Sequence, residues 1–269
     1  MSDSDRAVGE PQDEFAPFAE IYDAWLASAP ITSVHVPFYV EEFLRQGGRC
    51  VELGVGNGRI TIDAARRGID ITGVDVSPAM LALCRERAAA AGVADRVRLI
   101  ESDMRSFVLP APATTIALPF HTLGHMVTLD DKAALFRHVH SQLAPGGRFV
   151  FDMFVFDPAF VASRSGFAHI HSESRDARTG EDCVTWVCPV HDVPKQAIRV
   201  IAWTDRLDAR GSVTSRRYCR MDFSWVSPEQ VRERLLAAGF AIEHCWGGFD
   251  RSPFGDASKS QVWVARRPA

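Results

Sequence analysis

The chain has 269 residues, a formal net charge of −4 at pH 7 and a sequence pI near 6.1. Its 30 Lys and Arg residues are scattered, which argues against nucleic acid as a substrate because phosphate backbones are bound by clustered cations. The opening residues are acidic and polar, and no apolar run reaches the length of a membrane span. We therefore expect a soluble, cytoplasmic protein without a membrane partner.

Residues 1–47 precede the first predicted strand. Residues 1–14 contain almost no apolar side chain to bury, which predicts a disordered tail. Residues 15–27 and 34–45 carry apolar and aromatic side chains at helical spacing, so each range is expected to form a helix. The simplest role for this helix pair is to cover one edge of a sheet.

A strand, a glycine-rich turn and a helix follow one another between residues 50 and 67. The turn has glycine at every second position, at Gly54, Gly56 and Gly58. Glycine accepts positive φ and lets a ligand lie against bare peptide groups, while the helix N-terminus adds unpaired N–H donors. Arg59 stands where a dinucleotide-binding fold usually has its third glycine, which disfavours an NAD-linked dehydrogenase. A tight turn without a ligand is the alternative interpretation.

An acidic residue ends each of the next two predicted strands. Asp75 follows Gly54 by 21 residues, the separation at which a carboxylate on the second strand can accept both hydroxyls of a ribose. Asp103 ends the third strand and is followed by the apolar Met104, a combination suited to an adenine and its amino group. The glycine turn and the two acids therefore predict a binding site for an adenosyl compound.

Alternating helices and strands continue to residue 156. Ser77 and Pro78 open a helix that ends near residue 91, and a strand spans 113–118. A helix over 128–143 is followed by a turn at 145–147 and a strand over 148–154. In parallel sheets the ligand lies beyond the carboxyl ends of the strands. The residues expected at this crevice are Phe120, His121, His125, Asp152, Phe154 and Phe156.

The region from 157 to 226 departs from this alternation. Its β-branched and aromatic residues nearly alternate with polar ones, and 208–211 is typical of a hairpin turn. We expect an inserted antiparallel β subdomain, acting either as a substrate cover or as the surface of a homodimer. A helix over 227–238 and strands over 240–246 and 260–267 then complete the main sheet.

Four motifs in this order, VELGVGNGR, GVDVSPAML, ESDM and QLAPGGRFVFD, resemble those of class I S-adenosylmethionine-dependent methyltransferases. The resemblance implies a Rossmann-like α/β sheet with helices on both faces and an antiparallel last strand, formed by 48–156 and 227–269. It implies that the three glycines approach the methionine part of S-adenosylmethionine, Asp75 the ribose, and Asp103 with Met104 the adenine. Glu52, Val76 and Pro119 complete the expected cofactor contacts.

The same resemblance implies that residues 15–47 form a helical lid over cofactor and substrate. Tyr22, Trp25 and Tyr39 are then candidate substrate-binding residues, together with Phe120 and Phe154 at the crevice. Methyl transfer requires an aligned nucleophile and, where needed, a base to remove its proton. His121 is the first candidate base, because imidazole titrates near neutral pH, and His125 is the second. A histidine that only shapes the pocket is the alternative for His121.

The histidines also suggest a site for a divalent metal such as zinc. Its expected ligands are His121, His125, Asp152, His169 and His171. Unrelated histidines in a polar pocket are the alternative.

The strings FYVE, VELGVGNGRI, PFHTLGHM and SQLAPGGRFVFDMFVFDP are similar to those of bacterial enzymes that methylate 2-oxo acids at the β-carbon. This similarity implies C-methylation through a metal-stabilised enolate, in amino-acid or natural-product biosynthesis. An N- or O-methyltransferase of a small natural product, without a metal, is the alternative. A non-catalytic cofactor-binding partner protein is the third interpretation.

Overall fold

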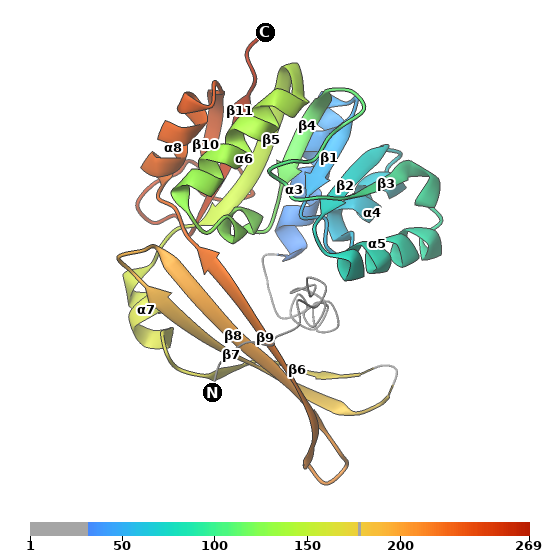
Figure 1. Cartoon of the computed structure of the whole chain (residues 1–269), viewed down its shortest axis with the longest axis vertical. Coiled ribbons are helices and arrows are strands. Elements are labelled where there is room, and N and C mark those ends of the chain that lie inside the picture. Colours follow the sequence, from blue (N-terminus) through green and yellow to red (C-terminus); the bar gives the residue numbers. More distant parts are fainter. Residues whose placement is uncertain (1–31, 177–178) are drawn as a thin grey trace, which may run out of the picture.

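The computed structural model describes residues 32–176 and 179–269. The predicted tail, the predicted helix over 15–27 and the lid candidates Tyr22 and Trp25 lie outside the described residues. Figure 1 shows a sheet flanked by helices, with a second sheet projecting from one of its ends.

The main sheet has seven strands in the order β10-β11-β5-β4-β1-β2-β3. The strands β1 to β5 run parallel, whereas β11 is antiparallel to both of its neighbours, β5 and β10. The expected Rossmann-like class with an antiparallel last strand is thus confirmed. The strands are β1 (Cys50–Leu53), β2 (Ile71–Asp75), β3 (Val97–Glu101), β4 (Ala113–Leu118), β5 (Leu143–Phe154), β10 (Ala241–Trp246) and β11 (Ser260–Arg266).

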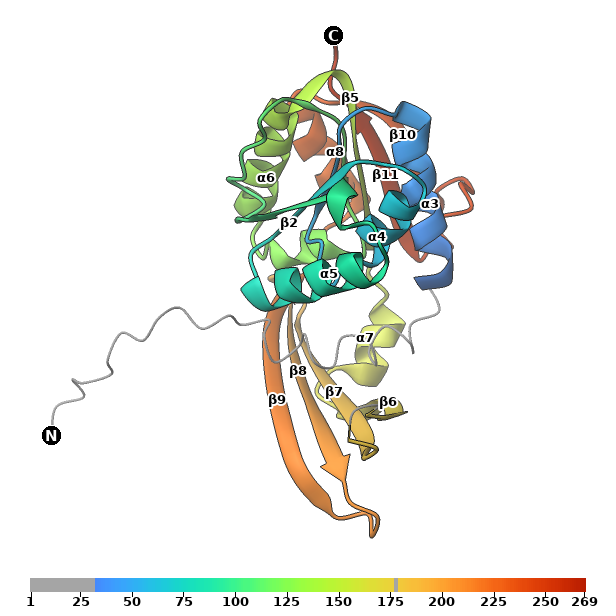
Figure 2. The same cartoon turned by 90° about the vertical axis from the view of Figure 1, so that its right-hand side faces the viewer.

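Helices cover both faces of this sheet, as the edge-on view in Figure 2 shows. On one face pack α3 (Thr32–Gln46), α4 (Arg59–Arg66) and α5 (Pro78–Ala90), and on the other α6 (Leu129–Gln142) and α8 (Pro228–Ala237). The second face is rich in rings: Phe136 of α6 contacts both Phe149 and Phe151 of β5. Burying each such ring contributes roughly 1.5–3 kcal/mol to the free energy of folding. This packing holds the carboxyl ends of the strands in fixed register.

Side-chain caps fix where the helices begin. Ser77 accepts a hydrogen bond from the Met80 amide at 3.2 Å, and Ser227 forms a reciprocal capping box with Gln230. Proline follows both serines at the first helical position, where its missing N–H is not needed. The Ser-Pro pairs recognised in the sequence are therefore true helix starts.

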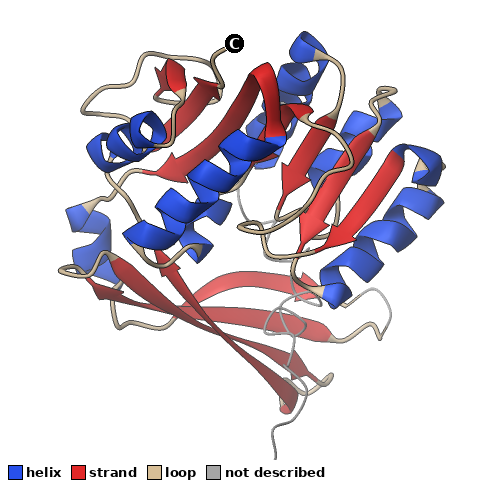
Figure 3. Ribbon diagram, turned by 45° about the horizontal axis from the view of Figure 1, so that its top comes forward, coloured by secondary structure: helices blue, strands red, loops and turns tan. Residues whose placement is uncertain are grey.

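The second sheet is antiparallel and contains β6 (His169–Arg175), β7 (Asp182–Asp192), β8 (Ala197–Leu207) and β9 (Val213–Ser224), in that order. Figure 3 shows it beneath the main sheet. The expected hairpin turn is present, because the Gly211 amide donates to the Asp208 carbonyl between β8 and β9. A short helix, α7 (Pro158–Arg164), precedes this sheet and was not predicted.

One expected turn is part of a strand. The sequence predicts a turn at 145–147, but β5 already begins at Leu143 and the pairing with β4 shifts register there. Gly146 takes φ +78° and donates to the Arg267 carbonyl, so the glycine pair makes an irregularity inside the strand. Among residues 32–176 and 179–269, no helix has the length and apolar character needed to cross a bilayer.

Candidate functional site

The glycine turn lies between β1 and α4, with all three glycines at positive φ. A Cβ built on Gly54 would lie 2.6 Å from Cγ2 of Thr122, and one on Gly58 would lie 2.5 Å from Sγ of Cys84. Any larger residue at these positions would strain the backbone and clash with a neighbour. Glycine is therefore required at Gly54 and Gly58 by both the backbone conformation and the packing of the turn against Thr122 and Cys84.

Asp75 ties this turn to the start of α5. Its Oδ2 accepts from the Gly56 amide at 2.8 Å, and its Oδ1 accepts from the Ser77 amide at 3.0 Å. The carboxylate thus stands at the end of β2 beside the turn, where the sequence places it. The next residue, Val76, is 53% exposed and leaves an apolar side chain on the same rim.

Asp103, the second predicted acid, pairs with Arg105. The Arg105 guanidinium donates to both carboxylate oxygens, at 2.6 Å to Oδ2 through Nη2 and at 3.0 Å to Oδ1 through Nε. The hydrogen bond from Arg105 lowers the pKa of Asp103, so the acid is ionised. Met104 follows, half-buried against the core. A ligand at Asp103 would therefore share the carboxylate with Arg105, a contact that the sequence did not reveal.

A small cavity of about 20 Å³ lies where β1, the glycine turn and the end of β4 meet. It brings together the predicted Glu52, Gly54, Pro119 and Phe120, and it adds residues that the sequence analysis missed, namely Val55, Asn57, Arg59, Ile60 and Thr122. Burial raises the pKa of Glu52 to about 7. Its Oε2 accepts from Thr61 Oγ1 at 2.5 Å, which anchors the acid to the first turn of α4.

Asp152 near the end of β5 is fully buried, accepts three hydrogen bonds and lies close to the ring of His121. Oδ1 accepts from the Tyr39 hydroxyl at 2.5 Å and from the Phe120 amide at 2.8 Å. Oδ2 accepts from the His121 amide at 3.1 Å and lies 2.9 Å from Nδ1 of His121. Burial alone would raise the pKa of Asp152, but the bonds from His121 and Tyr39 outweigh it and the pKa is lowered. Tyr39, a predicted lid residue, is fully buried in this cluster.

His121 is held in one orientation by this acid. A carboxylate can only accept, so the ring tautomer that suits this 2.9 Å contact has its proton on Nδ1 and leaves Nε2 as the ring's acceptor atom. The ring stacks on Phe120, and Phe154 meets it edge-on at 5.5 Å between centroids. Phe120 and His121 have φ of 60° and 59°, a left-handed pair that is costly for non-glycine residues and is typical of functional sites.

The predicted metal ligands do not gather. Of the five, only His121 and Asp152 form a pair, while His169 and His171 lie on β6 of the second sheet. In the described part of the chain no group of three or more His, Cys, Asp or Glu side chains is placed to hold a metal ion. Burial lowers the pKa of His125 to about 4, so this second candidate base is neutral at pH 7 and accepts protons weakly.

Phe223 at the end of β9 also reaches the site. Its ring stacks near Phe154, at 6.3 Å, and meets His125 edge-on at 4.9 Å. It also covers Gly124 in the short 3₁₀ helix η2 (Thr122–His125). The second sheet thus contributes an aromatic side chain to the crevice, and no local sequence signal marks Phe223 among the many aromatic residues of its strand region.

Comparison with known proteins finds a family model that matches part of the chain. Residues 50–147 match the family model described as "Methyltransferase domain". The chain is 29% identical to 27-O-demethylrifamycin SV methyltransferase of Amycolatopsis mediterranei, over 43% of this chain and 42% of that protein. In several curated relatives, including this one, the match covers only about a third to a half of the relative's length.

Solved structures match over nearly the whole length. The CcbJ methyltransferase of Streptomyces caelestis is 22% identical with a TM-score of 0.79, covering 97% of this chain and all of its own. The sugar N-methyltransferase KedS8 of a Streptoalloteichus species is 19% identical with a TM-score of 0.70, covering 100% of this chain and 97% of its own. At these identities the likeness establishes the shared fold, including the second sheet.

Proposed function

We propose that this chain, whose residues 50–147 match a methyltransferase domain, is a class I methyltransferase that transfers a methyl group from S-adenosylmethionine to an amine nitrogen of a small natural product. The fold match to a sugar N-methyltransferase over both full lengths supports an amino sugar or a similar polar amine as acceptor. The relative named for a 27-O-demethyl substrate marks oxygen as the competing acceptor atom.

The residues around the glycine turn fit the cofactor. S-adenosylmethionine supplies the electrophilic methyl group when it is bound. The peptide groups of Gly54, Gly56 and Gly58 would lie against its methionine part, on a turn whose backbone is at positive φ at all three glycines. Asp75 would accept the ribose hydroxyls, and Asp103 with Met104 would receive the adenine, with Glu52, Val76 and Pro119 around them.

The observation that carries the proposal is the pair formed by His121 and Asp152. An amine that arrives as ammonium must lose a proton before it can attack, and Nε2 of His121 is the acceptor that the pair makes available. Asp152 then stabilises the imidazolium, while the Tyr39 hydroxyl and two backbone amides keep Asp152 ionised and fixed. Proton removal and alignment are thus supplied by the chain itself.

C-methylation of a 2-oxo acid fits less well. That reaction would use a metal to stabilise the enolate, and the donor set predicted for it is split between the two sheets. N-methylation needs only a positioned base. The same base would serve an O-methyltransferase, so the acceptor atom is a question for product analysis.

Product analysis also tests the proposal. The full chain is incubated with S-adenosylmethionine and a panel of amino sugars, phenols and 2-oxo acids, and the site of methylation is found by tandem mass spectrometry. We expect N-methylated amines, with turnover lost in His121→Gln and retained in His244→Gln, which changes an exposed histidine on β10. Methylation of carbon in a 2-oxo acid would overturn the proposal, and cofactor binding without any turnover would favour the non-catalytic partner.

A further inference from the structure

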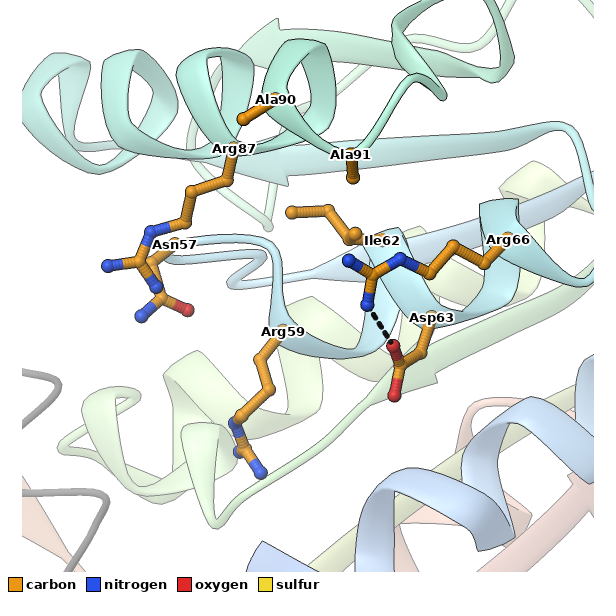
Figure 4. A pocket seen from close by; sticks show the side chains of 8 residues that line it. All are labelled: Asn57, Arg59, Ile62, Asp63, Arg66, Arg87, Ala90 and Ala91. Atoms are coloured by element: carbon orange, nitrogen blue, oxygen red, sulfur yellow. Dashed lines mark hydrogen bonds and ion pairs between the residues drawn. The ribbon is translucent and has the colours of Figure 1, made fainter.

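A second and larger cavity lies between α4 and α5, on the outside of the glycine turn. Its volume is about 460 Å³, within the range of small-molecule sites. Figure 4 shows Arg59 and Arg66 extending from α4 and Arg87 from α5. The apolar part of the lining is Ile62, Ala90 and Ala91, and the remaining residues are Asn57 and Asp63.

The charge of this lining is opposite to that of the whole chain. Three arginines face a single acid, Asp63, which pairs with Arg66 at 3.2 Å, so the lining carries a net charge of +2 (three minus one). The chain as a whole carries −4. A local excess of two guanidinium charges on an acidic protein attracts a dianion more strongly than a monoanion.

Guanidinium groups also select the kind of anion. Their planar N–H pairs match phosphate oxygens in a bidentate geometry, and several arginines around one group are typical of phosphate recognition. The cavity is large enough to hold more than the phosphate, and its apolar patch can pack against an attached organic group. We propose that the cavity between α4 and α5 binds a phosphorylated small molecule, with its phosphate held by Arg66 and Arg87.

This cavity is distinct from the acceptor site but adjoins the cofactor site. Asn57 and Arg59 line both cavities, whereas Arg66 and Arg87 line only the larger one. Variants of Arg66 and Arg87 therefore test the inference without changing the residues assigned to methyl transfer. The test measures binding alone, so its result is independent of the proposed reaction.

Binding is measured by titration calorimetry on the full chain at constant ionic strength. The probes are inorganic phosphate, pyrophosphate and glucose 1-phosphate, with acetate as the carboxylate control. We expect saturable binding of the phosphates and none of acetate. Arg66→Ala and Arg87→Ala should each weaken phosphate binding by roughly tenfold or more, because a charge-assisted contact is lost.

Two matched controls change the same helices. Arg67→Ala removes an exposed positive charge just after α4, and Arg85→Ala removes one on α5; neither residue lines the cavity. Both variants should leave the Kd for phosphate within about twofold of the native value. Arg66→Lys should retain part of the affinity, because the charge remains while the bidentate geometry is lost. Absence of saturable phosphate binding, or equal losses in the cavity and control variants, would overturn the inference. Tighter binding of glucose 1-phosphate than of phosphate would identify an organic phosphate as the ligand.

Discussion

At the scale of single residues, the site depends on how Asp152 is solvated. A buried carboxylate loses the hydration that favours its charge, and it remains ionised only if hydrogen bonds replace the lost water. Here the replacements come from Tyr39 on α3 and from the segment after β4. The left-handed backbone of Phe120 and His121 lets two successive amides point at one acid. The strained segment and the buried charge therefore support each other.

Replacing Asp152 by Asn should impair catalysis more than cofactor binding. The amide can present N–H to Nδ1 of His121, which favours the wrong tautomer and removes the charge that stabilises the imidazolium. We expect kcat to fall by roughly 10²–10⁴-fold with little change in the Kd for S-adenosylmethionine. Steady-state kinetics and calorimetry on the same preparation test this. A drop in cofactor affinity that matches the loss of kcat would instead assign Asp152 a general structural role.

Asp75→Ala should weaken S-adenosylmethionine binding by roughly 1.5–3 kcal/mol, because a charge-assisted contact to the ribose is lost. Asp70→Ala is the control, since Asp70 is an exposed acid just before β2 that pairs with Arg96 instead. Calorimetric titration gives both affinities. Unchanged affinity in Asp75→Ala would remove this residue from the ribose site.

Glu52 should make the stability of the ligand-free protein depend on pH. Because burial raises its pKa to about 7, the folded chain holds a proton that the unfolded chain releases near pH 4.5. The resulting contribution to the free energy of unfolding is on the order of 3 kcal/mol. It is fully present below about pH 4.5 and is lost as the pH rises through about 7. Glu52→Gln should therefore gain stability relative to the native chain between pH 5 and 8. Urea unfolding across that range measures the difference, and parallel curves would contradict the assignment.

At the scale of elements, the 3₁₀ helix η2 is fastened to the second sheet. Lys132 on α6 is buried and donates to the Met126 carbonyl and to Ser224 Oγ of β9. Ser224 in turn donates to the carbonyl of Gly124 or of Met126 at 3.1 Å. The segment that carries His121 is thus held between α6 and β9.

Gly124→Ala tests this arrangement. The added Cβ would lie 2.2–2.6 Å from the Phe223 ring, so the ring or η2 must move. We expect a loss of about 1–3 kcal/mol in stability and a lower kcat, because η2 continues directly from His121. Gly255→Ala is the matched control, since a Cβ there meets nothing within 4 Å. Equal kcat in the two variants would show that the second sheet does not position the base.

The elements predicted from sequence are those with strong local signals. The Ser-Pro caps and the apolar strands around the glycine turn act over a few residues, and within residues 32–176 and 179–269 the structure has helices at both caps and strands at 50–53, 71–75 and 113–118. Contacts between distant segments give no such signal. The role of Phe223 depends on how the inserted sheet docks, and the burial of Tyr39 depends on an acid 113 residues away. The glycine pair at 146–147 has the composition of a turn, but an irregularity inside a strand has the same local composition.

At the scale of the whole molecule, the two sheets contribute different residues to the candidate site. The main sheet supplies the glycine turn and the buried acid Asp152, and the second sheet supplies Phe223 and Ser224 from its last strand. This arrangement also separates the predicted metal ligands, because His169 and His171 lie on β6 while His121 and Asp152 belong to the main sheet. The sequence does not show where β6 lies, and in the structure β6 is the edge strand farthest in pairing order from β9, the strand that contacts η2.

This separation has a consequence for activity that can be measured directly. If proton removal rests on His121 and Asp152 alone, exhaustive treatment with a chelator, followed by its removal, should leave kcat for the amine acceptor unchanged within about twofold. Adding zinc back should not raise the rate, and His169→Ala should behave like the native chain, because His169 lies on an edge strand of the second sheet. Elemental analysis before and after treatment establishes that metal was removed.

A rate that falls on chelation and returns only with a divalent metal would mean that the two sheets come closer together than this structure shows. It would restore metal-assisted enolate chemistry on a 2-oxo acid as the better account.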